Sequence, residues 1–196
     1  MSELTLDVGQ ANELKMAFRR EGQWTNEEIK ILCERKGFLS SVHEALLGRA
    51  EIKPVEYLVD FDAKPFIPNG WTILPDSEQL AKRVCGQWKF DPTKVELYLN
   101  EGQKNGKSIE GNDLRKKLAN QPVMNANLLD FYLAHPKLIP ESWKGQYVFF
   151  WGTIYRSADG NLCVRYLYWN GGRWYWDCYW LENDWDSNYP SAVSGK

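Results

Sequence analysis

The beginning of the chain repeats one pattern, in which a capping residue precedes apolar positions at helical spacing and a glycine follows them. Leu14 and Phe18, for example, lie one turn apart and therefore on one helix face. Thr25 with Glu28 is the clearest start signal, because a threonine followed three positions later by glutamate forms a capping box. The pattern predicts a tri-helical unit over residues 1–53, whose helices begin near Asp7, Thr25 and Ser41 and end at Gly22, Gly37 and Gly48.

The pattern changes between residues 54 and 90. Val55, Tyr57 and Val59 occupy every second position, which is typical of a strand. Proline, asparagine and glycine at positions 65–70 then predict a turn before the apolar run 71–74. We interpret residues 54–90 as an extended connector or a small hairpin.

Helical spacing returns between residues 91 and 143. Asp91 followed by Pro92 is typical of a helix start, and the apolar positions after it predict a helix through Leu99. Asn112 and Asn125 can cap two further short helices, because asparagine side chains accept hydrogen bonds from the first amides of a helix. We therefore predict a second helical segment over residues 91–143.

Residues 144–190 contain three runs rich in aromatic and β-branched side chains, at 147–155, 162–168 and 173–180. The pair Asp159-Gly160 separates the first two runs, and Asn170-Gly171 separates the last two. Asn-Gly favours a type I′ hairpin turn, which needs positive φ at both central residues. The region is thus predicted to be a three-stranded antiparallel β-meander, and the whole chain an α+β protein in which the helical unit and segment pack with this meander.

A two-residue turn at Asn170-Gly171 would place Trp169 opposite Gly172 and Cys163 opposite Cys178. Because side chains alternate along a strand, two faces result. The first, interpreted as the core, holds Leu162, Val164, Tyr166, Tyr168, Tyr175, Tyr179 and Leu181, joined from the first strand by Val148, Phe150 and Ile154. The second, the tryptophan face, holds Arg165, Leu167, Trp169, Trp174, Trp176 and Trp180, joined by Trp151, Thr153 and Tyr155.

The tryptophan face has two interpretations. It either packs against the helical segment, with Arg165 lying on Trp176, or forms a stacking surface for a base, a sugar ring or a peptide. We favour the packed arrangement, because leaving four tryptophans in water forgoes about 10 kcal/mol or more of burial energy. As a binding site, the face would use Trp151, Tyr155, Arg165, Trp169, Trp174, Trp176 and Trp180.

Composition narrows the class of protein. Hydrophobic residues make up 43% and charged residues 26% of the 196 residues, as in a globular protein, but 10 Trp is a high count. The formal net charge of -2 argues against strong nonspecific nucleic-acid binding. The N-terminus has no basic, apolar leader and no apolar run reaches membrane length, so we expect a cytoplasmic protein without membrane association.

Four sequence stretches resemble a known group of proteins. They are DVGQANELK at residues 7–15, NANLLDFYLAHPKLIPESWK at 125–144, FFWGTIYR at 149–156 and VRYLYW at 164–169. Together they are similar to an uncharacterised family of small hypothetical proteins from uncultured bacteria, which has no established activity. The resemblance implies a bacterial cytoplasmic setting and assigns no catalytic or binding residue.

Candidate chemistry is sparse. Cys33, Cys85, Cys163 and Cys178 form no Cys-x-x-Cys pair, and the two histidines are far apart, so neither a metal site nor a cofactor is predicted. We expect the cysteines to stay reduced. Four carboxylates lie near the C-terminus: Asp177, Glu182, Asp184 and Asp186. They suit either glycoside hydrolysis or a solvated acidic edge of the sheet, and we favour the acidic edge.

The second and third predicted helices also resemble a helix-turn-helix unit, which would place Lys30, Arg35 and Lys36 near phosphates. The spacing from the turn glycine to Val42 is one residue short of that pattern, so a helical packing unit is favoured.

We therefore expect a non-enzymatic binding or interaction module with no catalytic residues, whose partner is another macromolecule, protein or nucleic acid. The alternative is a carbohydrate-binding or glycoside-hydrolysing protein that uses the tryptophan face and nearby carboxylates.

Overall fold

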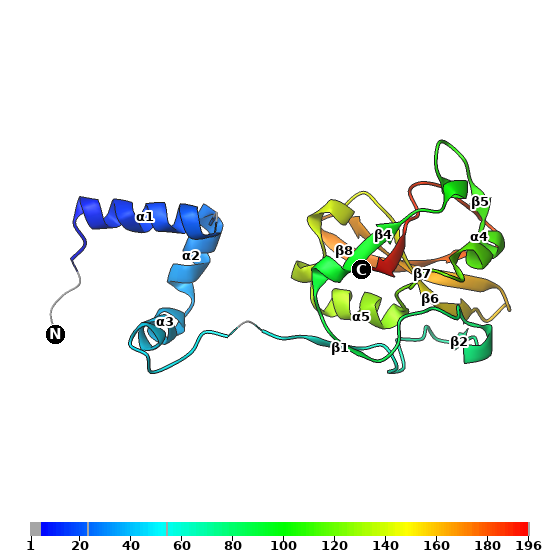
Figure 1. Ribbon diagram of the computed structural model, residues 1–196, viewed down its shortest axis with the longest axis horizontal. Helices are drawn as coiled ribbons and strands as arrows, with labels where there is room; N and C mark the ends of the chain where they lie inside the picture. The colour runs from blue at the N-terminus through cyan, green and yellow to red at the C-terminus, as the bar shows by residue number, and fades with distance from the viewer. Residues whose placement is uncertain (1–4, 23, 54, 196) are drawn as a thin grey trace. The chain divides into compact units, whose positions relative to one another are not determined.

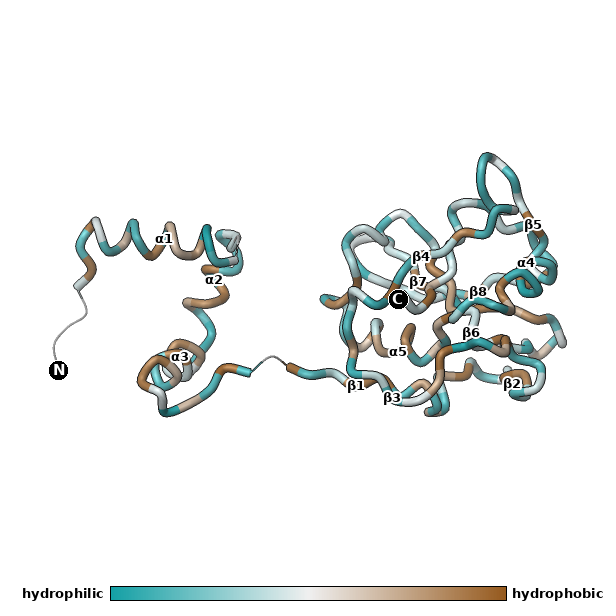
Figure 2. Tube along the Cα trace, in the orientation of Figure 1, coloured by the Kyte–Doolittle hydropathy of each residue, from teal (hydrophilic) through white to brown (hydrophobic). Residues whose placement is uncertain are grey.

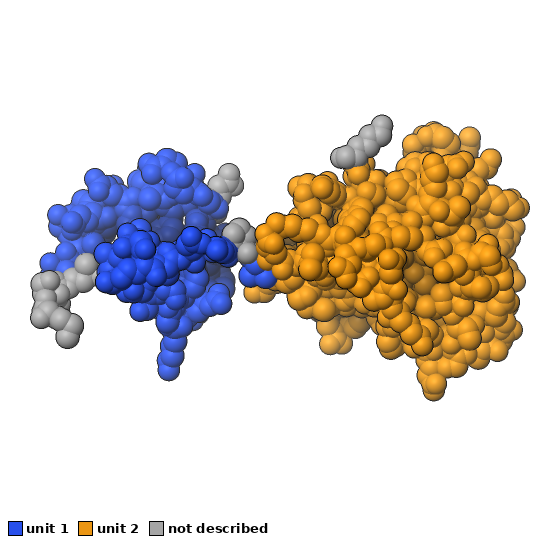
Figure 3. All heavy atoms as spheres, turned by 60° about the horizontal axis from the view of Figure 1, so that its bottom comes forward, with its two compact units in different colours: residues 1–55 blue, residues 56–196 orange. Residues whose placement is uncertain are grey.

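The computed structural model describes residues 5–22, 24–53 and 55–195. By its internal contacts the chain divides into two units, residues 1–55 and residues 56–196, coloured blue and orange in Figure 3. The predicted segments 91–143 and 144–190 lie wholly in the second unit, and so does segment 54–90 from residue 56 onward. Helices and a multi-stranded sheet are both present, so the α+β class is confirmed.

The N-terminal unit contains three helices, α1 (Val8–Gly22), α2 (Asn26–Glu34) and α3 (Phe38–Leu46). The capping box of α2 is present, because Glu28 N donates to Thr25 Oγ1 and Thr25 N donates to Glu28 Oε2. Helix α3 begins three residues earlier than the predicted Ser41, directly after Gly37, whose φ of 77° turns the chain. No side chain described in these three helices is buried, and hydrophobic stretches run along all three in Figure 2.

Thr25→Ala is expected to destabilise α2 by about 1 kcal/mol, because the Glu28 amide loses its only side-chain acceptor at the helix start. Faster hydrogen exchange at the amide of Glu28, with unchanged exchange in the C-terminal unit, is the measurable result. Thr25→Ser keeps the hydroxyl and serves as the matched control. Equal exchange in all three proteins would contradict the capping role.

The predicted meander forms one side of a larger sheet in the C-terminal unit (Figure 1). Strands β6 (Val148–Arg156), β7 (Leu162–Asn170) and β8 (Arg173–Trp180) pair antiparallel, as predicted. On the other side of β6 lie β10 (Ser191–Ser194), which is parallel to it, and then β4 (Val95–Tyr98). The short strand β2 (Thr72–Ile73) pairs with the end of β6, which makes six strands rather than three.

The prediction of a helix after Asp91 is wrong. Asp91 does cap, but only a single 3₁₀ turn, since the chain continues as strand β4 with Val95 buried and Glu96 exposed. Pairing of β4 with β10 outweighs the local helix signal because it completes the edge of the sheet. The sequence did not reveal β10, whose short SAVS run has little strand character on its own.

The remaining elements surround the sheet. Strand β1 (Leu58–Asp60) pairs with β3 (Gln87–Lys89), and β5 (Ile109–Glu110) pairs with β9 (Asp184–Trp185). Helix α5 (Ala126–Ala134) agrees with the prediction, and Asn125 caps it as expected. Helix α4 (Gly111–Leu118) is also present, but it begins one residue before Asn112, so the predicted capping role of Asn112 is wrong. Five 3₁₀ turns complete the unit: η1 (Asp76–Glu78), η2 (Pro92–Lys94), η3 (Glu101–Gln103), η4 (Pro136–Leu138) and η5 (Glu141–Trp143).

The core has two main parts that share the central strands. One cluster packs α5 residues such as Leu128 and Tyr132 against Leu167 and Trp174 of the tryptophan face. The other packs α4 residues such as Leu114 together with Val164 and Trp185. Both faces of the sheet are therefore at least partly covered.

Candidate functional site

The centre of the β7–β8 hairpin turn lies one residue later than the sequence analysis placed it. Asn170 pairs with Arg173, so Gly171 and Gly172 form the loop, with φ values of 55° and 91°. Two glycines adopt these positive φ values without the strain that asparagine would carry. The register moves by two residues, and Trp169 faces Trp174. An even shift leaves each side chain on its predicted face, so the tryptophan face is formed as expected.

The first strand follows a different course. Between Phe149 and Ile154 the register of β6 against β7 shifts by an odd number of residues, which reverses the alternation of side chains. Trp151 therefore leaves the tryptophan face and packs on Trp185, with ring centroids 4.7 Å apart. Val148 and Phe150 move in the opposite direction, to the cluster around Leu167. The predicted face is wrong for these three residues and right for Ile154 and Tyr155.

The tryptophan face is largely covered by α5 and the segment before β2. Trp174 is 9% exposed and Tyr155 is fully buried, whereas Trp169, Trp176 and Trp180 are half-buried. At its open end, Lys144 Nζ lies 4.0 Å from the ring centroid of Trp169. A groove of about 350 Å³ lies there between the helical turns and the hairpin, lined by Leu133, Pro136, Lys137, Glu141, Trp169, Gly172, Arg173 and Trp174.

Arg165 forms a buried polar cluster at the centre of this face. Its side chain is 1% exposed, and Nη2 lies 2.9 Å from Oδ1 of Asp130 on α5. The guanidinium carbon also lies 4.3 Å from the ring centroid of Trp176, the cation–π contact expected from the sequence. Burial raises the pKa of Tyr155 to about 12, so this phenol stays neutral beside the cation and acts as a donor.

Cys163 and Cys178 lie diagonally and not directly opposite, because Cys163 pairs with Trp180 and Cys178 with Arg165. Their side chains still meet, and a hydrogen bond with Cys178 together with burial raises the pKa of the Cys163 thiol. All four cysteines are free, as expected.

The opposite face presents six partly exposed tyrosines, although the sequence analysis assigned four of them, Tyr166, Tyr168, Tyr175 and Tyr179, to the core face. This tyrosine face consists of Tyr147, Tyr166, Tyr168, Tyr175, Tyr179 and Tyr189. Neighbouring rings touch throughout: Tyr147 lies 5.5 Å from Tyr166, and Tyr168 lies 5.7 Å from Tyr175 across the strands. Tyr147 is the most exposed, at 39%. Two buried aromatic residues of the α4 side of the core pack against these rings: Phe149 contacts Tyr166, and Trp185 contacts Tyr179.

Carboxylates lie among these tyrosines. Asp177 is exposed and stands opposite Tyr166 in the β7–β8 register. Burial raises the pKa of Tyr166, and the charge of Asp177 raises it further. Burial, Tyr179 and Asp186 likewise raise the pKa of Tyr189. The tyrosine face therefore combines neutral phenol groups with two carboxylates, and one cation lies at its hairpin end, where the guanidinium carbon of Arg173 is 4.5 Å from the ring centroid of Tyr175.

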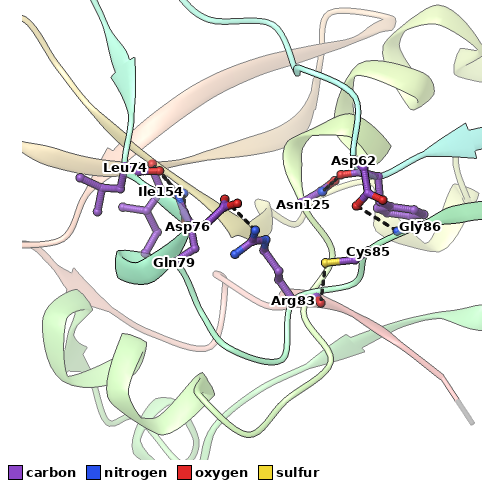
Figure 4. Close-up of polar contacts among 10 residues, drawn as sticks. Asp62, Leu74, Asp76, Gln79, Arg83, Cys85, Gly86, Asn125 and Ile154 are labelled. Carbon is purple, nitrogen blue, oxygen red and sulfur yellow. Dashed lines mark hydrogen bonds and ion pairs between the residues drawn. The ribbon is translucent and has the colours of Figure 1, made fainter.

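A polar cavity of about 260 Å³ lies beside the start of α5, between residues 61–86 and the irregular part of β6 (Figure 4). Arg83 Nη2 lies 2.8 Å from Asp76 Oδ1, and Gln79 bonds to the backbone of Leu74 and Ile154.

The helix start offers this cavity no free amide. Ala126 N donates to Thr153 Oγ1, and Asn127 N donates to Asn125 Oδ1. Asn125 also donates through Nδ2 to the carbonyl of Phe61. These contacts hold the 61–86 segment on the domain, which gives the cavity a structural role.

The residues predicted to contact nucleic acid lie in the N-terminal unit. Lys30 is on α2, while Arg35 and Lys36 lie in the turn before α3, and all three are exposed. Arg35 lies over the ring of Phe38, 5.2 Å from its centroid. The same unit exposes large apolar side chains, among them Leu46 at 80% and Ile52 at 65%.

Comparison with known proteins adds no assignment. No protein-family model, curated protein or solved structure matches the chain. Within residues 5–22, 24–53 and 55–195, no helix is long and apolar enough to cross a membrane. Among the same residues, no three His, Cys, Asp or Glu side chains gather in a way that would hold a metal ion.

Proposed function

We propose that this is a non-enzymatic interaction protein and that its tyrosine face binds a protein partner. The observation that carries the proposal is the continuous contact of six partly exposed tyrosines on one sheet face. Tyrosine is enriched in protein interfaces, because its ring provides a large contact area with little loss of conformational entropy while its hydroxyl forms hydrogen bonds.

The charge on this face favours protein over nucleic acid. Asp177 and Asp186 lie beside the phenol groups and would repel phosphates. A partner surface with lysine or arginine near apolar groups would complement both the carboxylates and the rings. The N-terminal unit, with its exposed apolar side chains, is consistent with a protein that works through interactions.

The ring orientations argue against a stacking platform for bases or sugars. Planar ligands need aromatic rings that lie flat and side by side. Here the ring planes of Tyr147 and Tyr166 meet at 81°, and those of Tyr147 and Tyr189 at 53°. Tyr168 and Tyr175 come nearest to parallel, at 24°, and the pairs Tyr147–Tyr168 and Tyr179–Tyr189 are tilted by 36° and 35°. A tilted array of this kind suits the uneven surface of a protein.

Substituting two central tyrosines tests the proposal. Tyr168→Ala/Tyr175→Ala removes the stacked cross-strand pair, and each interface tyrosine of this type contributes about 2 kcal/mol. A partner captured by the wild-type chain from its source organism and then purified should lose at least about 100-fold in affinity for this variant.

Leu58→Ala is the matched control, because Leu58 is an exposed apolar residue on β1, outside the tyrosine face. It should bind as the wild type does. The proposal is wrong if the double variant binds every captured protein as well as the control does. It is also wrong if oligo(dT) or a chito-oligosaccharide binds the wild type and loses binding with the double variant.

A further inference from the structure

The segment of residues 64–68 crosses the tryptophan face without belonging to any strand. Its sequence is Lys-Pro-Phe-Ile-Pro, so two prolines flank Phe66 and Ile67. Segments of the form Pro-x-x-Pro are extended before they bind, and they dock in aromatic-lined grooves at low entropic cost. Here the chain supplies both the segment and an aromatic surface beneath it.

Side chains of three different elements hold the backbone of Phe66. Its N–H donates to Oδ2 of Asp130 at 2.8 Å, and its carbonyl accepts from the hydroxyl of Tyr155 at 3.0 Å. Nη1 of Arg165 donates to the same carbonyl at 3.3 Å. One carboxylate oxygen of Asp130 thus binds the segment, and the other oxygen pairs with Arg165. These three contacts are all made to the peptide backbone of Phe66.

The side chain of Phe66 adds aromatic contacts to these backbone bonds, because the guanidinium carbon of Arg165 lies 5.2 Å from its ring centroid. Phe66 is 52% exposed and lies edge-on over Trp176, with ring centroids 5.5 Å apart. Trp176 and Trp180 themselves stay partly exposed while the segment is in place. The strong contacts are therefore polar and charge-assisted, and the aromatic contacts are shallow, as expected for a surface that exchanges one peptide for another.

Holding a loop with a buried ion pair requires a large desolvation free energy. Arg165 is withdrawn from water, and such a pair stabilises a fold no better than apolar side chains of similar size. What an arginine and an aspartate add is paired recognition of a carbonyl and an amide, which apolar side chains cannot provide.

We propose that the tryptophan face around Arg165 is a peptide groove, that its ligand is an extended, proline-flanked segment of another protein, and that residues 64–68 occupy it in cis. The incoming peptide displaces Phe66 and takes over its bonds to Asp130, Tyr155 and Arg165. This groove is separate from the tyrosine face and does not depend on the function proposed for it.

A competition experiment tests the groove. A labelled peptide with the sequence of residues 63–69 is titrated into the wild type and into Phe66→Ala, which weakens the cis segment but keeps the Arg165–Asp130 pair. Binding to the variant should be about tenfold tighter, because the tethered competitor is weakened. The same peptide with both prolines and the phenylalanine changed to alanine is the control and should bind neither protein. Equal binding of the native peptide to both folded proteins, or to neither, overturns the proposal.

Hydrogen exchange of the wild type gives an independent result if the variant does not fold. The amide of Phe66 should exchange through local opening, at least about tenfold faster than the amides at the centre of β7. Exchange of Phe66 only at the rate of the β7 amides would mean that the segment opens with the whole domain, which also overturns the proposal.

Discussion

Asp130→Asn is expected to lower the free energy of unfolding of the C-terminal unit by about 3–5 kcal/mol, the largest effect expected from any single conservative substitution in this unit. The variant leaves the guanidinium of Arg165, which is 1% exposed, without a negative partner. Asn keeps the shape of the side chain, so no cavity forms, and the loss combines the uncompensated charge of Arg165 with one lost acceptor, because Asn has a single oxygen for the Arg165 and Phe66 N–H contacts. Urea unfolding followed by tryptophan emission gives the change in midpoint.

Two further variants distinguish the effect of breaking the buried ion pair on stability from the effect of removing any carboxylate charge. Asp130→Asn/Arg165→Met removes both charges and should recover part of the lost stability, with a coupling of about 1 kcal/mol or more. Asp113→Asn breaks an exposed ion pair with Lys116 and should change stability by less than about 1 kcal/mol. If Asp130→Asn costs no more than Asp113→Asn, the ion pair does not stabilise the fold.

Gly152→Ala is expected to lower the free energy of unfolding by about 1–3 kcal/mol, because the new methyl group has no room. A Cβ at this position would lie 2.8 Å from Cβ and 2.9 Å from the backbone Cα and N of Asn125. Those backbone atoms belong to the cap of α5 and cannot move without disturbing the helix start. Amides in the first turn of α5 should therefore exchange faster, in addition to the shift in the urea midpoint.

Gly102→Ala is the matched control for this prediction. Its new Cβ would meet the Cδ1 atom of Ile109 at 3.3 Å, the end of a flexible side chain that can rotate away. The control should lose much less stability and leave exchange in α5 unchanged. Similar losses in the two variants would mean that the close approach of β6 to Asn125 is not a constraint on the fold.

The candidate site could be predicted only in part. The register of the β7–β8 hairpin placed Arg165 and Trp176 in contact correctly, because a shift of two residues preserves the faces. Neither Asp130 nor Phe66 was recognised as a partner of Arg165. These residues lie far from Arg165 in the sequence, and no local pattern indicates which residues meet across the sheet.

The tyrosine face shows why burial was harder to predict than pairing. Alternation assigned Tyr166, Tyr168 and Tyr175 to one side of the sheet, together with Val164. Their mixed apolar and polar character then suggested a core. How far α4 and β9 extend over that side decides the exposure, and this extent depends on packing between distant elements.

Local signals determined the helices with strong caps and the three long strands. Thr25 and Asn125 act within one helical turn, and the aromatic and β-branched runs at 147–155, 162–168 and 173–180, separated by turn glycines, were enough to predict the three long strands. Tertiary structure decided the rest: β4 instead of a helix, the place of β10 beside β6, and the irregular stretch that turned Trp151 away from the tryptophan face. Each depends on a partner distant in sequence, because a short strand is stabilised only by the neighbour that completes its hydrogen bonds.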